Sequence, residues 1–322
     1  MTATGRRRQT LLLGGTLLVA IAVTAGISAW VRAADPAAGL AEAVKTGGLA
    51  GAAVVALYGL WLNDRRRRVE EARQVVDEDR LRLDGDRIGH ERFAKAVELL
   101  GNEADQSRVG AMHALVGLAR GTPEYTQTVI DVLCSYLRRP FFHYGYLRDG
   151  PDPDRGDSVE PDRGRLSAEE TADDRERQVR LTAQRVLLEL LPAAGSAGPA
   201  YDLDLTGASL EYLDLAGRRV GGLRARRATF FGITRLGGAE FTGRVMLSGA
   251  VFRGRVELVD TRFPLGFSLE RARLLAEVDL SGAEFGDFAD LRWQTAETVL
   301  LDGAAALPGV RLKLPPGVSV PP

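Results

Sequence analysis

The side chains that most often carry catalysis or bind metals are scarce in this sequence. It has three histidines and one cysteine, which are His90, His113, His143 and Cys134. No two of them have the spacing of a metal-ligand pair such as H-x-x-x-H or C-x-x-C. Cys134 falls on the apolar face of a predicted helix, where a buried hydrophobe is more common than a nucleophile. There is also no G-x-S-x-G, phosphate-loop or dinucleotide motif, so we expect no enzyme activity, no metal site and no cofactor.

Arginine supplies nearly all of the basic charge, since all but three of the 42 basic residues are arginine. The net charge is −1, so composition gives no general reason to expect a nucleic acid partner. Five arginines in the C-terminal half come at successive turns of the repeat described below. They form a candidate binding patch of Arg218, Arg219, Arg224, Arg226 and Arg227. This patch would suit an acidic partner or an anionic lipid, and the alternative is that these side chains are only solvated.

Two uncharged stretches near the N-terminus are long enough to cross a membrane. Residues 11–30 form the first, and a helix of that length spans roughly 30 Å, the thickness of the hydrocarbon core. Residues 46–63 form the second, in which Gly47 and Gly51 would let two helices approach closely. We therefore expect an integral membrane protein with a two-helix transmembrane hairpin in residues 1–64, with spans at about 11–31 and 46–63.

The charges that flank these stretches predict their orientation. Arginines at 6–8 precede the first stretch and arginines at 65–68 follow the second, whereas the charges of the loop between them cancel. Because basic residues are retained on the cytoplasmic side, both termini of this multi-pass protein of the cell membrane should be cytoplasmic. The alternative is a cleaved signal peptide that begins RRRQTLLLGG, including one of the twin-arginine type. The full spanning length, the lack of a clean cleavage site and the second stretch favour the hairpin.

Helical periodicity dominates residues 65–147, which we interpret as a helical stalk and a small helical unit. Apolar residues recur at helical spacing within residues 93–100, 109–119 and 130–137. Thr122 followed by Pro123 is a start signal for the last of these helices. The aromatic run at 141–146 is expected to pack on the helical unit, and partner docking is the minority alternative.

Residues 148–172 have almost no apolar side chains and predict a disordered linker. A further helix should begin near Asp173 and stop at Pro192. Residues 173–199 are therefore expected to form a helix and an N-terminal cap for the repeats that follow.

Residues 200–292 carry a five-residue repeat that changes to an eleven-residue repeat after Phe230. In the first part apolar residues come in pairs two apart, such as Leu203 and Leu205, and such residues face the same side of a strand. In the second part, segments such as GAEFTGRVMLS recur every eleven residues, which is two five-residue units with one corner widened. Stacked coils would bury these pairs as continuous columns. The pattern predicts a β-solenoid with four pairs per coil and a little over four coils, followed by a C-terminal cap or tail at 293–322.

A coil of 22 residues predicts which side chains stack inside the solenoid. Phe241, Phe263 and Phe285 should form one inward column, with Phe263 the most enclosed of the three. Arg218 occupies an inward position that normally holds a small residue, so a bulge or an outward turn is expected there. Arg253 lies at a corner, where its side chain should contribute little to stability.

The run LDLTGASLEYLDLAG resembles the pentapeptide-repeat family, whose units read A-(D/N)-L-x-x with a central Leu or Phe. The resemblance implies a right-handed, quadrilateral β-helix with one pentapeptide per side. The order of membrane hairpin, helical unit and repeats resembles the membrane-anchored pentapeptide-repeat proteins of high-GC, actinomycete-like bacteria. The expected fold class is therefore a multi-unit α+β chain.

Some members of this family mimic duplex DNA and bind type II topoisomerases through a long acidic surface. Between residues 202 and 292 the thirteen acidic residues are matched by thirteen arginines, which argues against mimicry. We therefore expect a membrane-anchored, non-enzymatic interaction scaffold that presents its solenoid to a cytoplasmic protein partner. The alternative is a regulator of a nucleic-acid enzyme, such as a type II topoisomerase, through the repeat surface.

Overall fold

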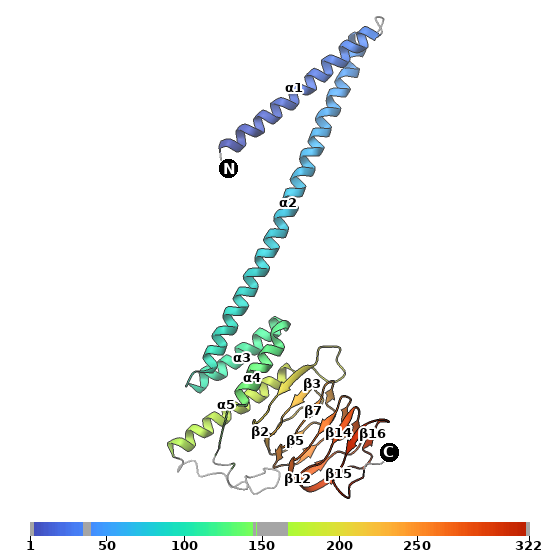
Figure 1. Ribbon diagram of the computed structural model, residues 1–322. Coiled ribbons are helices and arrows are strands. Elements are labelled where there is room, and N and C mark those ends of the chain that lie inside the picture. The colour runs from blue at the N-terminus through green and yellow to red at the C-terminus, as the bar shows by residue number, and fades with distance from the viewer. Residues whose placement is uncertain (1–2, 35–39, 144–145, 147–166, 320–322) are drawn as a thin grey trace. The chain divides into compact units, whose positions relative to one another are not determined.

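The computed structural model describes residues 3–34, 40–143, 146 and 167–319. The chain divides into two compact units, Met1–Arg87 and Ile88–Pro322. Helix α1 (Ala3–Ala34) lies in the first unit, and helix α2 (Leu40–Leu100) begins in the first unit and ends in the second. The second unit contains the remaining helices and all the strands (Figure 1). Most of the predicted disordered linker, its residues 148–166, lies outside the described residues.

The described residues contain one helical stretch that is long and apolar enough to cross a membrane, Gly15–Ala34 in α1. Residues 46–63, the predicted second span, are helical within α2, but the side chains of Thr46, Val54 and Leu62 lie outside the described residues. The one candidate span is therefore a finding, and the two-span hairpin stays a prediction.

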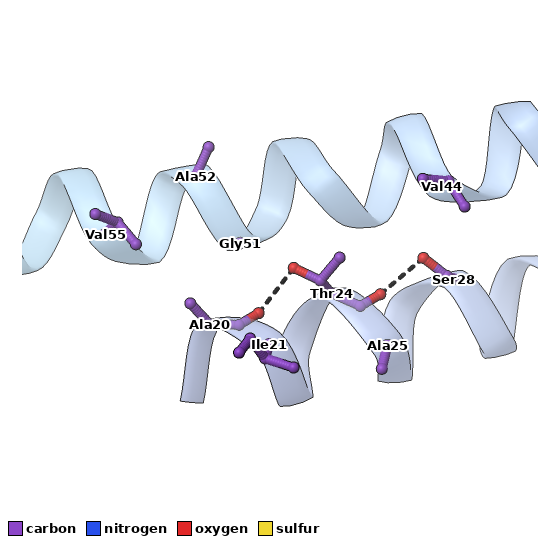
Figure 2. Close-up of a pocket in the computed structure, with 9 residues that line it drawn as sticks. All are labelled: Ala20, Ile21, Thr24, Ala25, Ser28, Val44, Gly51, Ala52 and Val55. Carbon is purple, nitrogen blue, oxygen red and sulfur yellow. Dashed lines mark hydrogen bonds between the residues drawn. The ribbon is translucent and has the colours of Figure 1, made fainter. Parts of the chain in front are cut away.

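Helices α1 and α2 approach each other closely at Gly47 and Gly51 of α2, and Figure 2 shows the approach at Gly51. A Cβ atom added to Gly47 would lie 2.5 Å from the Thr24 carbonyl oxygen, and one added to Gly51 would collide with the Thr24 hydroxyl. Any larger residue would therefore push the helices apart. The Thr24 and Ser28 hydroxyls donate to carbonyls of their own helix, at 2.7 Å each, so they leave no free donor toward α2. The predicted close approach at Gly47 and Gly51 is confirmed.

The helical part of the second unit comprises the end of α2, then α3 (Asp105–Gly121), the 3-10 turn η1 (Pro123–Tyr125), α4 (Thr126–Leu137) and α5 (Ala168–Leu190). Most residues of the predicted apolar faces are buried, except Val97, which is 38% exposed, and Cys134 is 1% exposed as expected. Helix α5 begins at Ala168 and not near Asp173, because Ser167 and Glu170 form a capping box. The capping box therefore starts the helix at Ala168 although the first turn contains few apolar residues.

The strands form a β-solenoid of about five turns (Figure 1). They are β1 (Tyr201–Asp204), β2 (Ser209–Glu211), β3 (Arg219–Arg224), β4 (Thr229–Phe231), β5 (Thr234–Arg235), β6 (Glu240–Phe241), β7 (Val245–Met246), β8 (Val251–Phe252), β9 (Val256–Glu257), β10 (Arg262–Phe263), β11 (Phe267–Ser268), β12 (Arg273–Asp279), β13 (Glu284–Phe285), β14 (Phe288–Asp290), β15 (Thr295–Leu300), β16 (Ala305–Ala306) and β17 (Arg311–Lys313). These strands pair in parallel throughout, and Val245 pairs with Phe267, which pairs with Ala289. The predicted repeat of 22 residues per coil is confirmed.

The solenoid extends further than predicted, because β15, β16 and β17 add to the strands of the previous coil. The segment that was expected to be only a cap or tail therefore continues the ladder past Arg292. The apolar residues of this segment do not follow the five-residue spacing, so the repeat pattern in the sequence ends earlier than the ladder of backbone hydrogen bonds.

The predicted phenylalanine column is present. The rings of Phe241 and Phe263 lie 5.7 Å apart, as do those of Phe263 and Phe285, and both pairs are stacked. Phe263 is fully buried, but so is Phe285, because Ala306 of the additional coil covers it. The prediction that Phe263 is the most enclosed of the column is therefore wrong.

Candidate functional site

The Gln127 side chain caps the first coil of the solenoid, because its amide makes the two backbone hydrogen bonds that a neighbouring strand would make. Asp202 of β1 donates its backbone N–H to Gln127 Oε1 at 2.9 Å, and its carbonyl accepts from Gln127 Nε2 at 3.0 Å. Gln127 belongs to α4, and the next residue after that helix, Arg138, forms an ion pair with Asp204 at 3.2 Å. An open edge of backbone groups would invite pairing with another chain. The amide of Gln127 removes that opportunity at β1.

The segment after α5, which contains Pro192 and Ala194, caps the next side of the same coil by backbone hydrogen bonds. Arg219 donates its N–H to the Pro192 carbonyl at 2.8 Å, and Ala194 donates to the Gly217 carbonyl at 2.8 Å. The Arg218 side chain reaches the Leu191 carbonyl at 3.2 Å. The expected bulge or outward turn near Arg218 appears as a register shift that begins two residues later, while the Arg218 side chain itself is held by the end of α5.

The one irregularity of the first ladder lies close to Arg218, opposite Asp202. The register shifts between Val220 and Leu223, where two glycines take the place of a bulky pair. The Gly222 N–H donates to the Asp202 carboxylate at 2.5 Å. Glycine is needed here because a Cβ on Gly221 would collide with that carboxylate.

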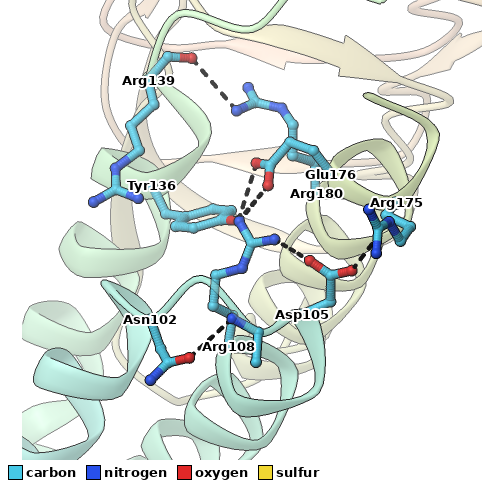
Figure 3. Close-up of polar contacts among 9 residues, drawn as sticks. Asn102, Asp105, Arg108, Tyr136, Arg139, Arg175, Glu176 and Arg180 are labelled. Atoms are coloured by element: carbon cyan, nitrogen blue, oxygen red, sulfur yellow. Dashed lines mark hydrogen bonds and ion pairs between the residues drawn. The ribbon is translucent and has the colours of Figure 1, made fainter. Parts of the chain in front are cut away.

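A polar cluster ties the three helices α3, α4 and α5 together (Figure 3). Arg108 of α3 donates to Asp105, to Glu176 of α5 and to the Tyr136 hydroxyl, the last at 3.0 Å. Tyr136 of α4 in turn donates to Glu176 at 3.0 Å. Burial and the Glu176 charge raise the pKa of Tyr136, so its hydroxyl stays protonated at neutral pH. The cluster is suited to holding the helices in place and offers no group poised to exchange a proton.

A second polar cluster joins the helical part to the solenoid. Glu211 of β2 accepts from Arg177 Nε at 2.8 Å and from the Tyr146 hydroxyl at 2.5 Å. The Tyr146 ring stacks on Phe231 of β4, with 3.8 Å between the ring centroids. Burial, followed by the Glu211 charge, raises the pKa of Tyr146. This described part of the aromatic run therefore packs on the solenoid as well as on the helices, while Phe142 is 58% exposed.

The chemistry available to these clusters is limited. Burial raises the pKa of the Cys134 thiol to about 12, so the thiolate that a nucleophile requires does not form at neutral pH. The described residues contain no group of three His, Cys, Asp or Glu side chains that could hold a metal ion. His143 is buried and lies 3.4 Å from Asp174 of α5. We interpret both clusters as structural.

The structure places the five arginines of the predicted patch in different surroundings. Arg219 forms an ion pair with Glu240 at 3.0 Å, Arg224 lies 3.4 Å from Asp204, and Arg218 is held by the Leu191 carbonyl. Only Arg226 and Arg227 remain exposed without an acidic neighbour among the described residues. The structure thus divides the predicted patch into three engaged arginines and two available ones.

Two further available arginines, Arg271 and Arg273, were not part of the prediction. Arg271 follows Arg227 by two coils of 22 residues and takes the same turn conformation, with φ of 58° against 56°. The coil length, applied to the arginines as it was to the phenylalanines, is the signal that could have found Arg271.

Elsewhere on the solenoid, charges of opposite sign alternate from coil to coil. Four such pairs are Arg235 with Glu257 at 3.5 Å, Arg255 with Glu277 at 3.5 Å, Arg262 with Glu284 at 2.9 Å, and Arg311 with Asp287 at 3.3 Å. Pairs this exposed contribute little stability each. Their main consequence is that these columns present no continuous surface of one sign.

Arg253 differs from the expectation of a freely solvated corner residue. Its guanidinium lies over the Phe231 ring, 5.6 Å from the centroid, and the side chain is only partly exposed. A cation–π contact of this kind contributes about 0.5–1 kcal/mol. Arg253 is therefore part of the packing that joins Tyr146 and Phe231 to the solenoid.

Comparisons with known proteins add no assignment to this geometry. No protein-family model, no curated protein and no solved structure matches the chain. The fold, the sealed first coil and the distribution of charge therefore carry the functional inference.

Proposed function

We propose that this chain is a membrane-anchored, non-enzymatic interaction scaffold that presents a pentapeptide-repeat solenoid to a cytoplasmic protein partner. The observation that carries the proposal is that the helices and the solenoid share one hydrophobic core, which runs from Ala96 through Cys134 and Val186 to Ala304. A solenoid joined to its cap in this way is a rigid platform. Its outward side chains recur at about 4.8 Å from coil to coil, which suits recognition of an extended partner.

The pentapeptide-repeat assignment is supported by the number of inward pairs in one coil. Between Leu223 and Val245 the buried pairs are Leu223 with Ala225, Ala228 with Phe230, Thr234 with Leu236, and Ala239 with Phe241. Four pairs per coil fit a four-sided, right-handed coil with one repeat unit on each side. The bacterial, actinomycete-like origin is part of the same proposal and is supported by the dominance of arginine over lysine.

The proposed anchor consists of Gly15–Ala34 together with a second span at 46–63. Its support is the close approach of α1 and α2 at Gly47 and Gly51, which is typical of packed membrane helices. The arginines at 6–8 and 65–68 favour a cytoplasmic location for both ends of such a hairpin. A reporter fused after Arg68 should be active only in a cytoplasmic format. Activity of a periplasmic-type reporter at that position would contradict this topology.

The interaction function is tested by photocrosslinking in intact cells. A photoreactive amino acid replaces Arg235, Arg255 or Arg262 on the solenoid of the full-length chain, and Lys95 on α2 is the control position. The proposal expects a discrete protein adduct from one or more solenoid positions, identified by mass spectrometry, and none of the same mass from Lys95. Absence of any adduct specific to the solenoid would contradict it.

The alternating charges also bear on the other candidate, regulation of a type II topoisomerase. A DNA mimic needs a continuous acidic surface, and Arg235 in the column of Glu257, like Arg262 in the column of Glu284, interrupts one. We expect residues 65–322 to leave gyrase supercoiling unchanged, whereas inhibition at micromolar concentration would favour this alternative.

A further inference from the structure

Four exposed arginines of the solenoid stand apart from the rest because they have no acidic partner. The other exposed arginines from Arg219 to Arg311 lie within 4 Å of a carboxylate. Within the described part of the chain, no carboxylate lies within ion-pair distance of these four, which are Arg226, Arg227, Arg271 and Arg273. They are distributed over only two of the coils.

Three of these four arginines, Arg226, Arg227 and Arg271, lie at one corner of the solenoid, and Arg273 begins strand β12 directly after that corner. Arg227 donates its N–H to the Ser248 carbonyl at 3.0 Å, and Gly249 donates to the Glu270 carbonyl at 2.8 Å, so Arg227, Gly249 and Arg271 occupy equivalent turn positions in successive coils. With about 4.8 Å between coils, Arg227 and Arg271 are about 10 Å apart. Gly249 lies between them and has no side chain. We call this row of four arginines the basic edge.

Among the described residues, two carboxylates without an ion-pair partner, those of Asp260 and Asp302, lie at a different corner. Asp260 donates its N–H to the Ser281 carbonyl, and Gly282 donates to the Asp302 carbonyl, so Asp260 and Asp302 belong to one turn column. Along the chain this column comes two corners after the column of the basic edge. In a coil with four sides, corners two apart are diagonally opposite. Asp260 and Asp302 therefore lie on the side of the coil away from the basic edge.

We propose that the basic edge binds an extended acidic segment of the cytoplasmic partner, an inference that rests on the proposed scaffold function. A guanidinium binds a carboxylate through two parallel hydrogen bonds, and these four have no intramolecular carboxylate to compete. An extended chain advances about 3.3 Å per residue, so carboxylates three residues apart match the 10 Å between Arg227 and Arg271. A Cβ on Gly249 would lie 3.4 Å from Arg227 Cγ, so the absence of a side chain there lets Arg227 extend toward the next coil. A corner this narrow fits a single strand better than the flat surface of a bilayer.

The proposal is tested with the full-length chain in nanodiscs of neutral phosphatidylcholine. The probe is a fluorescent twelve-residue peptide with Glu at every third position and Ser and Gly between, and its binding is measured by fluorescence anisotropy at 0.15 M salt. The test variant carries Arg226→Gln, Arg227→Gln, Arg271→Gln and Arg273→Gln. The matched control carries Arg235→Gln, Arg255→Gln, Arg262→Gln and Arg311→Gln, which removes the same charge from arginines that are ion-paired. Thermal unfolding checks that both variants remain folded.

We expect the basic-edge variant to bind the probe at least tenfold more weakly, which corresponds to about 1.4 kcal/mol, and the control variant to change less than twofold. A peptide with Gln in place of Glu should not bind. Equal losses in both variants would overturn the proposal, since they would mean that only net charge matters. The proposal would also be overturned if the basic-edge variant still bound the peptide but no longer bound phosphatidylglycerol vesicles, because the ligand would then be a membrane surface. A variant that changed only in self-association would overturn it too, because the ligand would then be a second copy of this chain.

The crosslinking experiment separates failure of this inference from failure of the scaffold function. If the partner adduct forms equally in cells with the basic-edge variant, the scaffold function stands and the basic edge is not its binding site. If no solenoid adduct forms with the unmodified chain, the scaffold function itself fails. Loss of the adduct only in the basic-edge variant would support both.

Discussion

Replacing Phe263 by alanine tests the packing of the solenoid interior most directly. The ring is fully buried and lies 5.7 Å from Phe241, 5.7 Å from Phe285 and 4.3 Å from Phe267. The substitution removes these contacts and leaves a cavity. The coils on either side are held by parallel ladders from β6 through β10 to β13, so they cannot close the space. We expect a loss of about 3–5 kcal/mol in the free energy of unfolding, the usual range for a buried Phe→Ala change.

The assay is urea unfolding of residues 65–322, followed by tryptophan fluorescence. Trp293 is the only tryptophan of this fragment, and it packs against the core at the last coils. Phe142→Ala is the matched control, because it removes the same ring from a side chain that is 58% exposed, and its effect should stay below about 0.5 kcal/mol. A loss below about 1 kcal/mol for Phe263→Ala, or one equal to that of the control, would refute the interpretation of a rigid stacked column.

Three further predictions follow from the cap, from a buried carboxylate and from the anchor. Gln127→Ala should lower the free energy of unfolding by about 0.5–1 kcal/mol, because water only partly replaces its two exposed hydrogen bonds to the Asp202 backbone, whereas Gln178→Ala on the exposed surface of α5 should not. The hydrogen bond from Arg292 lowers the pKa of Asp290, so the stability that this carboxylate contributes is present above about pH 4 and is lost as the pH falls through the lowered pKa. In urea unfolding, the difference in free energy between the native chain and Asp290→Asn should therefore stay constant from about pH 5 to 7 and shrink below about pH 4. The full-length chain should remain in the membrane pellet after carbonate washing while residues 65–322 are soluble, and release of the full-length chain by salt alone would contradict an integral anchor.

The regular parts of the fold could be predicted from the sequence because their signals are local and repeated. Pairs of apolar residues two apart define strands, and their recurrence every eleven residues defines half a coil. Together these two signals are enough to assign Phe241, Phe263 and Phe285 to one column. The buried position of Cys134 and the close approach at Gly47 and Gly51 follow in the same way from helical spacing. Each of these inferences needs only residues that are neighbours in sequence or related by the repeat.

The ends of the repeat could not be predicted as well. Strands β15 to β17 lack the strict five-residue pattern, yet they pair because the preceding coil presents an edge of backbone donors and acceptors. The start of α5 was misplaced because a capping box at Ser167 acts through hydrogen bonds and not through apolar spacing. Both errors occur where backbone hydrogen bonding, and not burial, determines the boundary.

The sequence by itself determined the coil length, the inward columns and the neutral total charge of the solenoid, since these depend on the order of residue types alone. Only the tertiary structure decided which charged side chains are paired. Arg218 is engaged because the end of α5 returns to the first coil, and Arg253 is engaged because its coil places it over Phe231. Arg226 and Arg271, by contrast, have no carboxylate neighbour in the described coils. Pairing depends on distances of about 3–4 Å between residues that are far apart in the sequence, and such distances arise only when the coils and helices pack together.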